Sequence, residues 1–287
     1  MKKITLCKGN IEYELRIDKY KIIVGTNYSK KFELMNIFRS SFECIKSSYS
    51  ESNNLMTNIL INDLEIDSKK CALYDLSPSF DLGSDLKMGS KSITYKYMDT
   101  ILRNQLYFDS LNTINLLFLS LEEEINHEES DIRIALCDFN YKMLMKLIST
   151  FIVIEDEKAN MYDLTYEEHI LLQLKMISKI VENSVCEETF IILDIPILTK
   201  KMFYVIEKLQ RCSIFIFTNE YENELDINDV FICSQYPIDL ADEGKIYSVF
   251  CEEYNVLYEL KEIQIMLNNY VNNIRDEFTE LIIKILE

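Results

Sequence analysis

Residues 21–32 read Lys-Ile-Ile-Val-Gly-Thr-Asn-Tyr-Ser-Lys-Lys-Phe, a short β-branched run that passes through a glycine into a helical pattern. A phosphate-binding loop, with the consensus G-x-x-x-x-G-K-[ST], joins a strand to a helix in this way. Gly25 and Lys31 have the consensus separation, but Lys30 replaces the second glycine and Phe32 replaces the hydroxyl that binds magnesium. The loop therefore lacks both the backbone cradle for a phosphate and the metal ligand.

A second apolar run, Phe190–Leu193, ends in Asp194 and resembles the strand whose aspartate holds the metal in active phosphate-loop enzymes. No catalytic carboxylate follows, because the next residues are Ile195 and Pro196. Since the loop and the aspartate strand occur in the right order, we expect a nucleotide-hydrolase fold that has lost its chemistry. An ordinary strand–turn–helix with a surface lysine pair is the alternative. The expected vestigial nucleotide site consists of Gly25, Lys31 and Asp194.

The order of the elements predicts an α/β fold. A β-rich start and a β/α end flank a block, from about 91 to 184, that is nearly free of Gly and Pro and has helical spacing. Short apolar strands from both ends suit one largely parallel sheet that is buried on both faces. We expect a degenerate phosphate-loop NTPase-like sheet head at 1–88 and 186–250, an inserted all-helical leg at 89–185 and a C-terminal helical tail at 251–287.

Within this plan, Lys8-Gly9-Asn10 is typical of a hairpin turn. Apolar runs bounded by turn residues predict strands at 4–7, 11–17, 21–24, 56–61, 71–76, 190–193, 213–217, 230–233 and 246–250. Apolar residues at helical spacing predict helices at 30–46, 198–209 and 252–286, the second with Thr199 as its N-cap.

The chain has 287 residues and a formal net charge of −18, which argues against general adhesion to nucleic acid. The charge is unevenly distributed, however. Residues 1–50 carry ten basic and five acidic groups, residues 121–170 four and thirteen, and residues 218–287 four and sixteen. A basic surface can therefore lie within an acidic protein.

Three lysine pairs lie near the predicted ends of head elements. If the fold brings them together, they can contact phosphates without reading base sequence. The alternative is that they are ordinary solubilising surface lysines. The candidate DNA-binding residues are Lys30, Lys31, Lys69, Lys70, Lys200 and Lys201.

A run of carboxylates crosses a predicted helix break at Asn160. Calcium takes several oxygen ligands from a flexible segment, which two helix ends and a turn can supply, although the spacing is not that of an EF-hand. The alternative is a solvated acidic turn in which Asp163 or Thr165 caps the next helix. The candidate metal ligands are Glu155, Asp156, Glu157, Asp163, Glu167 and Glu168.

Several classes of protein are disfavoured. The eight cysteines include no Cys-x-x-Cys pair and there are two histidines, so a zinc cage is not expected and a reducing, cytoplasmic location fits best. No apolar stretch is long enough to span a bilayer, so no membrane partner is expected. His127 and His169 stand beside glutamates, as helix-surface residues do, and no nucleophile or metalloprotease motif occurs. We expect no catalysis.

The segment Met161–Glu168 reads Met-Tyr-Asp-Leu-Thr-Tyr-Glu-Glu and precedes a predicted helix. The strand Thr189–Leu193, the helix start Leu198-Thr199-Lys200 and the strand Ser213–Phe217 follow. This layout resembles the Csn-type adaptation family of type II-A CRISPR loci. That family has a similar acidic Leu-Asp-Leu-x-Tyr segment before a helix and a Leu-Thr-Lys helix start between two apolar strands. The resemblance covers most of residues 1–235.

The resemblance implies a non-enzymatic protein that forms tetrameric rings and binds free ends of double-stranded DNA through a lysine-lined channel. It implies a role in spacer acquisition, beside the CRISPR integrase and the RNA-guided effector nuclease. It also implies Ca²⁺ bound by leg carboxylates, for which the acidic residues named above are the candidates. The family's channel lysines have no residue-by-residue match in this chain.

Two other functions stay open. An active phosphate-loop ATPase or nucleotide-binding protein would use Gly25, Lys31 and Asp194, although Phe32 argues against magnesium binding. An acidic protein-interaction module without DNA binding would use the tail at 252–287 as its partner surface.

Overall fold

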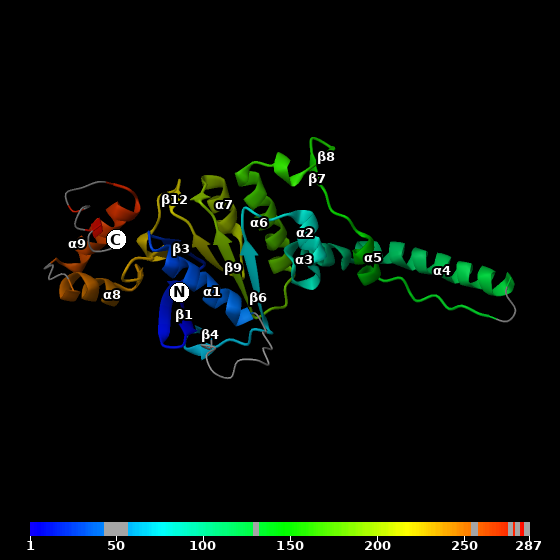
Figure 1. Ribbon diagram of the computed structural model, residues 1–287, viewed down its shortest axis with the longest axis horizontal. Helices are drawn as coiled ribbons and strands as arrows, with labels where there is room; N and C mark the ends of the chain where they lie inside the picture. Colours follow the sequence, from blue (N-terminus) through cyan, green and yellow to red (C-terminus); the bar gives the residue numbers. More distant parts are fainter. Residues whose placement is uncertain (43–56, 129–131, 254–257, 275–277, 279–281, 284–287) are drawn as a thin grey trace. The chain divides into compact units, whose positions relative to one another are not determined.

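The computed structural model describes residues 1–42, 57–128, 132–253, 258–274, 278 and 282–283. The chain forms two compact units (Figure 1), a head made of Met1–Pro78 with Val185–Glu287 and a leg made of Ser79–Ser184. The head therefore combines the two ends of the sequence, and the C-terminal tail belongs to it.

The head is built on a six-stranded sheet in the order β14-β13-β3-β11-β9-β6. Its strands are β3 (Tyr20–Val24), β6 (Cys71–Leu76), β9 (Glu188–Asp194), β11 (Ser213–Phe217), β13 (Val230–Ile232) and β14 (Ile238–Asp239). Only β14 is antiparallel to its neighbour. The central strand β11 is buried along its whole length, as is typical of a parallel strand covered on both faces.

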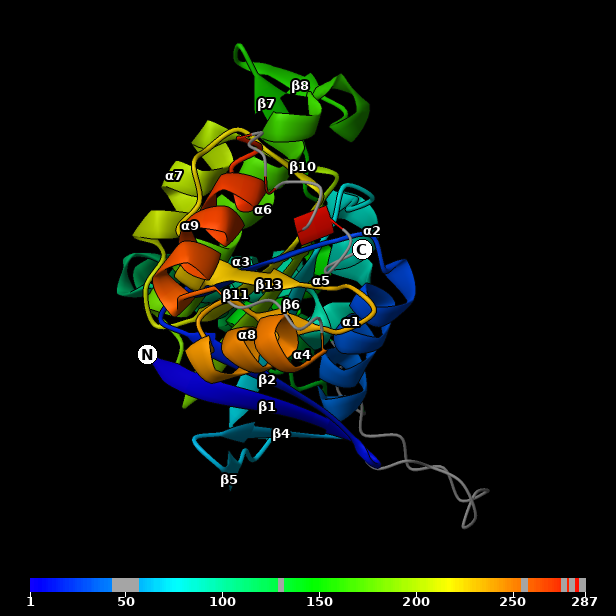
Figure 2. The same ribbon diagram turned by 90° about the vertical axis from the view of Figure 1, so that its left-hand side faces the viewer.

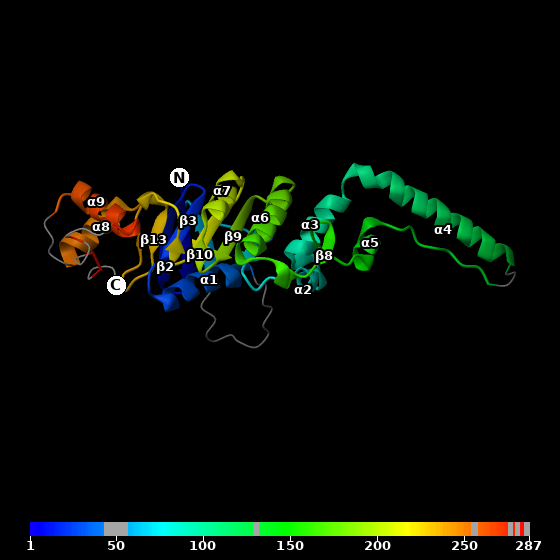
Figure 3. The same cartoon turned by 90° about the horizontal axis from the view of Figure 1, so that it is seen from above.

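Helices α1 (Tyr28–Phe42) and α7 (Lys200–Lys208) cover opposite faces of this sheet (Figure 3). On one face the ring centroids of Phe38 and Phe215 lie 4.4 Å apart, and on the other those of Phe203 and Tyr20 lie 5.3 Å apart. Helix α1 begins two residues before the predicted helix at 30–46. Positions 43–46 of that prediction lie outside the described residues.

A second, antiparallel sheet of four strands has the order β2-β1-β4-β5 (Figure 2). Its strands are β1 (Lys2–Lys8), β2 (Ile11–Ile17), β4 (Thr57–Ile61) and β5 (Leu64–Glu65). Ile4 and Leu15 from this sheet share one core with Leu34 of α1 and Phe215 of the other sheet. The expectation of one sheet for all strands was wrong, because strand alternation does not reveal which strand pairs with which.

The rest of the head follows β9 and β11. Strands β10 (Ile197–Leu198) and β12 (Glu220–Tyr221) form a short parallel pair, and η4 (Ile227–Asp229) precedes β13. The strand predicted at 246–250 is wrong: α8 (Glu243–Ser248) runs into a π-helical turn at Val249–Glu253. Ile246 and Phe250 are four residues apart and both buried, so a helix places them on one face. The tail contributes α9 (Leu260–Val271), and the remainder of the helix predicted at 252–286 lies largely outside the described residues.

The leg is mostly helical. Its elements are α2 (Leu82–Lys87), η1 (Gly89–Lys91), α3 (Ile93–Leu102), η2 (Gln105–Tyr107), α4 (Phe108–Glu128), α5 (Tyr141–Leu147), β7 (Ile152–Ile154), β8 (Glu157–Ala159), η3 (Met161–Asp163) and α6 (Tyr166–Glu182). The hairpin β7–β8 departs from the expected all-helical leg. Its turn residues, Glu155 and Asp156, have φ of 49° and 65°, the left-handed conformation that two-residue hairpin turns require.

The predicted α/β class with an inserted helical region is confirmed. Among the helices of the described residues, none has the length and apolar character needed to cross a bilayer.

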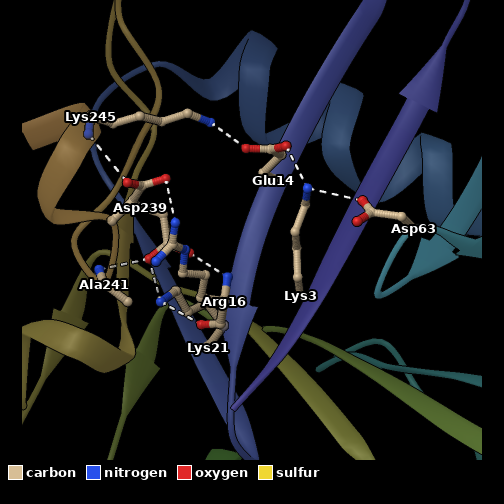
Figure 4. A network of polar contacts seen from close by, with 9 residues as sticks. Lys3, Glu14, Arg16, Lys21, Asp63, Asp239, Ala241 and Lys245 are labelled. Carbon is tan, nitrogen blue, oxygen red and sulfur yellow. Dashed lines mark hydrogen bonds and ion pairs between the residues drawn. The ribbon is translucent and has the colours of Figure 1, made fainter. Parts of the chain in front are cut away.

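A buried ion pair holds the two sheets of the head together (Figure 4). Lys21 Nζ of β3 lies 2.5 Å from Asp239 Oδ1 of β14, and both side chains are at most 2% exposed. Asp239 Oδ2 also accepts a hydrogen bond from the backbone N–H of Arg16 in β2, at 2.5 Å. Lys21 Nζ donates to the carbonyl oxygens of Arg16 and Asn228, at 2.9 and 2.7 Å. Burial lowers the pKa of Lys21, and the charge of Asp239 opposes that shift.

Exposed ion pairs extend this contact across the antiparallel sheet (Figure 4). Glu14 of β2 pairs with Lys245 of α8 and with Lys3 of β1, each at 3.0 Å, and Lys3 also pairs with Asp63 at 3.0 Å. The two lysines lower the pKa of Glu14. The edge of the parallel sheet, the antiparallel sheet and α8 are thus linked by charged contacts.

Replacing Lys21 with methionine tests the weight of the buried pair. Lys21→Met leaves Asp239 buried without its cation, so we expect the free energy of unfolding to fall by about 3–5 kcal/mol. Urea denaturation of the whole chain measures this. Lys70→Met removes the exposed pair between Lys70 and Glu187 and is the matched control, for which we expect little change. Equal effects of the two substitutions would show that the buried pair has no special role.

Candidate functional site

The carboxyl ends of β3, β9 and β11 meet at one edge of the parallel sheet, where α/β proteins commonly bind ligands. Gly25 follows β3 with φ of +108°, and a Cβ there would lie 2.4 Å from the carbonyl oxygen of Cys233. That same oxygen accepts a hydrogen bond from Asn27 N at 3.2 Å. A glycine is therefore required here, because the loop packs closely against the segment after β13. The backbone N–H of Asn27 points into the head, whereas an active loop would offer such an N–H to a phosphate.

Lys31, the residue at the phosphate-binding lysine position, points into the head. Its ammonium donates to the carbonyl oxygen of Thr218 at 3.1 Å and to Asn219 Oδ1, both just after β11. Asn219 Nδ2 in turn donates to the hydroxyl of Tyr28 at 3.0 Å. Burial lowers the pKa of Lys31 to about 8, while the charges of Cys233 and Asp194 act in the opposite direction. The lysine is held by the fold itself.

Asp194 ends β9 at the same edge. Partial desolvation raises the pKa of its carboxyl, Asp75 adds to the rise, and Arg39 and Lys31 oppose it. Arg39 Nε contacts Asp75 Oδ2 at 2.5 Å, so this cation is already paired. The structure thus brings Gly25, Lys31 and Asp194 to one sheet edge, as the sequence predicts.

A cavity of about 700 Å³ opens at this edge. Lys31, Phe32, Asp194 and Asn219 contribute to its walls. The ring of Phe32 is 58% exposed at the position where an active loop supplies a hydroxyl to magnesium. Among the described residues, no three His, Cys, Asp or Glu side chains lie close enough to hold a metal ion.

The tail lies on the other side of the loop. Asn272, the C-cap of α9, accepts from Leu225 N at 2.8 Å and donates to Leu225 O at 3.1 Å, and the hydroxyl of Tyr221 donates to Val271 O. A second cavity of about 660 Å³ is lined by the loop residues Gly25 and Thr26 and by tail residues. No pattern in the sequence pointed to this contact. Asn219, by contrast, could have been noted, since polar residues directly after a parallel strand commonly line such an edge.

The three lysine pairs do not come together as one group. Lys30 and Lys31 follow β3 and Lys200 and Lys201 follow β10, all on the carboxyl side of the parallel sheet, whereas Lys69 and Lys70 precede β6 on the amino side.

The individual lysines differ in exposure and partners. Lys30 Nζ lies 3.9 Å from Glu33 and Lys70 Nζ lies 3.1 Å from Glu187. Lys200 and Lys201 are exposed, immediately after the cap residue Thr199, whose hydroxyl accepts from Met202 N. The DNA-binding role of the six lysines stays a prediction.

The six acidic candidates of the leg lie at separate local structures. Glu155, Asp156 and Glu157 form the exposed tip of the β7–β8 hairpin. Asp163 accepts from Asn160 N at 2.7 Å and Glu168 accepts from Thr165 N at 2.9 Å, each in a capping box. Thr165 is therefore confirmed as the N-cap of α6, whereas Asp163 is the third residue of the preceding turn and does not cap that helix. Within the described part of one chain, these carboxylates with Glu167 do not make a calcium site.

Neither a protein-family model nor a curated protein sequence matches the chain. Solved structures do. Stu0660 of Streptococcus thermophilus matches with a TM-score of 0.67 and 16% identity, over 94% of this chain and 86% of that one. The recombination mediator protein RecF of the RecFOR pathway matches with a TM-score of 0.41 and 13% identity, over 80% of this chain and 95% of that one, which is too low a score to support an inference. The chain has the fold of Stu0660.

Proposed function

We propose that this chain is a non-enzymatic, ring-forming protein that binds ends of double-stranded DNA, regardless of sequence, during CRISPR spacer acquisition. The observation that carries the proposal is the fold match to Stu0660, a CRISPR-locus-associated protein, over 94% of the chain. The motifs at 161–168 and 198–200 indicate the same family from the sequence. The CRISPR integrase and the RNA-guided effector nuclease are the proposed functional partners.

The phosphate loop supports a role without catalysis. Nucleotide hydrolysis needs a cation free to contact the phosphates and a hydroxyl for magnesium. Lys31 instead donates to Thr218 and Asn219, and Phe32 stands at the hydroxyl position. The observed contacts therefore favour the DNA-binding proposal over an active ATPase.

Helix α4 supports assembly into homo-oligomers, with a tetramer as the proposed form. One side of it packs on the returning chain (Figure 1): Asn115 exchanges two hydrogen bonds with the backbone of Phe139, and Asn126 does the same with Ile134. None of the described residues of α4 is buried. The helix exposes five large apolar side chains along its length, each by 47–66%: Phe108, Leu116, Leu117, Leu119 and Leu121. Five large exposed apolar side chains on one helix are more than the single ones usual on a surface, and they support a protein–protein contact.

The calcium prediction requires more than one chain. Asp163 and Glu168 already accept backbone hydrogen bonds within one protomer. A calcium ion shared with carboxylates of a second copy would neutralise them and let acidic legs approach.

The exposed apolar residues of α4 give a prediction for solution mass. We expect the wild type to exceed the 34.0 kDa of one chain, and more so with calcium than with EDTA. Leu116→Glu with Leu117→Glu should return it toward one chain, because charged residues resist burial in an apolar contact. Light scattering after size exclusion measures this. The control is Val185→Glu with Leu64→Glu, two exposed apolar residues outside α4. A wild type that stays at one chain in both buffers contradicts ring formation.

A gel shift with linear and covalently closed circular duplex of one sequence tests DNA-end binding. We expect a shift of the linear form only, because a ring must be threaded from an end, and a steep loss of binding with salt, because phosphate contacts release counterions. Equal shifts of both forms would contradict end binding. No shift of either form at low salt would remove DNA from the proposal and favour the acidic interaction module.

A further inference from the structure

Helix α7 carries a basic surface on this acidic chain. Lys200, Lys201, Tyr204 and Lys208 are exposed on the side opposite its buried residues, and we call these four residues the α7 basic face. Arg211 follows just beyond the helix end and is exposed. Among residues 199–211 four cations thus stand against one carboxylate, Glu207, in a chain of net charge −18.

The positions of these lysines are not explained by helix stability. Cations near a helix N-terminus oppose the helix dipole, yet the first turn of α7 holds Lys200 and Lys201 and no acidic residue. At the other end, Lys208 and Lys19 are favourably placed, since Lys19 Nζ donates to the carbonyl oxygen of Glu207. A ligand with negative charge along the whole helix accounts for both ends.

The spacing fits a polyanion of regular repeat. Lys201 and Lys208 are seven residues apart, or about 10 Å along the helix axis. One strand of duplex DNA carries a phosphate about every 3.4 Å of axis, so this distance spans about three phosphates. Between them, Lys208 Nζ lies 3.7 Å from the ring centroid of Tyr204, which is 59% exposed.

The backbone conformation of Arg211, just after α7, is unusual for an arginine. Its φ of +60° lies in the left-handed region, where glycine or asparagine is favoured. An arginine is uncommon in this conformation, and its charge extends the α7 basic face beyond the last turn.

We propose that the α7 basic face, with Arg211, is the surface along which the phosphate backbone of double-stranded DNA runs. The inference rests on the proposed function and assigns its DNA contact. Two carboxylates border the face, Glu207 on α7 and Glu222, which accepts from Lys200 N at 3.1 Å. We assign the contact to Lys201 and Lys208, which are both exposed on this face.

A protein partner fits this face less well. Stable protein contacts centre on desolvated apolar or aromatic anchors. Apart from Tyr204, the exposed positions of α7 are charged residues, while its apolar residues Met202, Phe203 and Ile206 are buried in the head. Long-range charge, without an apolar anchor, matches the phosphate backbone.

The experiment measures binding of the full chain to a linear duplex over a salt series, by fluorescence anisotropy. Lys201→Gln with Lys208→Gln is the test variant. Lys175→Gln with Lys261→Gln, exposed lysines on α6 and α9, loses the same charge and is the control. Each lost phosphate contact should reduce the slope of log affinity against log salt by about 1, so we expect a reduction of about 2 for the test variant and none for the control.

Arg211→Gly is the second variant. Glycine adopts a φ of +60° without strain, so the fold is kept while the charge is lost. We expect an unfolding temperature no lower than that of the wild type, and a slope reduced by about 1.

The outcomes separate the two proposals. If the wild type binds DNA and the test and control variants have the same salt slope, the α7 assignment is overturned and DNA binding is kept. Absence of wild-type binding at low salt overturns the proposed function itself. A test variant that keeps the wild-type slope but changes solution mass assigns the face to contact with protein and also overturns the inference.

Discussion

The hydrogen bonds from the Lys31 ammonium to the residues after β11 determine what the carboxyl edge of the parallel sheet can do. They tie the first turn of α1 to the end of β11 and leave the buried cation with acceptors from the chain itself. Gly25 packs on the backbone of Cys233, where a Cβ would collide with the carbonyl oxygen. The loop therefore keeps the shape of a phosphate site, while its donors are used for folding.

The parallel sheet could be predicted because its central strands are apolar throughout. The strand predicted at 213–217 has the bounds of β11, and the strand predicted at 190–193 lies within β9 (Glu188–Asp194), since a strand buried on both faces needs no partner to be recognised. The hairpin of β1 and β2 was predicted from its turn. Its assignment to a separate sheet depends on pairing with β4, a contact between residues about fifty positions apart that local patterns do not contain.

The errors have the same origin. Ile246 and Phe250 suit either a strand or a helix in so short a segment, and the packing of α8 decides. Gly25, Lys31 and Asp194 were correctly predicted to share an edge of the sheet, because they stand at or after the carboxyl ends of parallel strands. That Lys31 turns inward depends on Asn219, whose side chain is placed by β11. The carboxylates of the leg were grouped by sequence proximity, yet two of them cap separate helical turns.

The net charge of the chain likewise does not reveal where its charged side chains lie. Although the net charge is −18, the exposed side of α7 is basic, and two lysines in its first turn stand at the positive end of the helix dipole. Composition averages over surfaces that meet different partners. The role of a lysine depends on its position in the fold. The ammonium of Lys31 donates to the backbone of Thr218 and that of Lys70 pairs with Glu187, whereas the lysines of α7 are exposed at the surface.

Magnesium-ATP binding is the most direct measurement of whether Lys31 is committed to the fold. We expect the unfolding temperature of the full chain to be the same with and without magnesium-ATP, because the loop has neither a free lysine nor a magnesium ligand. A saturable, magnesium-dependent rise that Lys31→Met abolishes would contradict this, and would restore the nucleotide site that the contacts of Lys31 argue against.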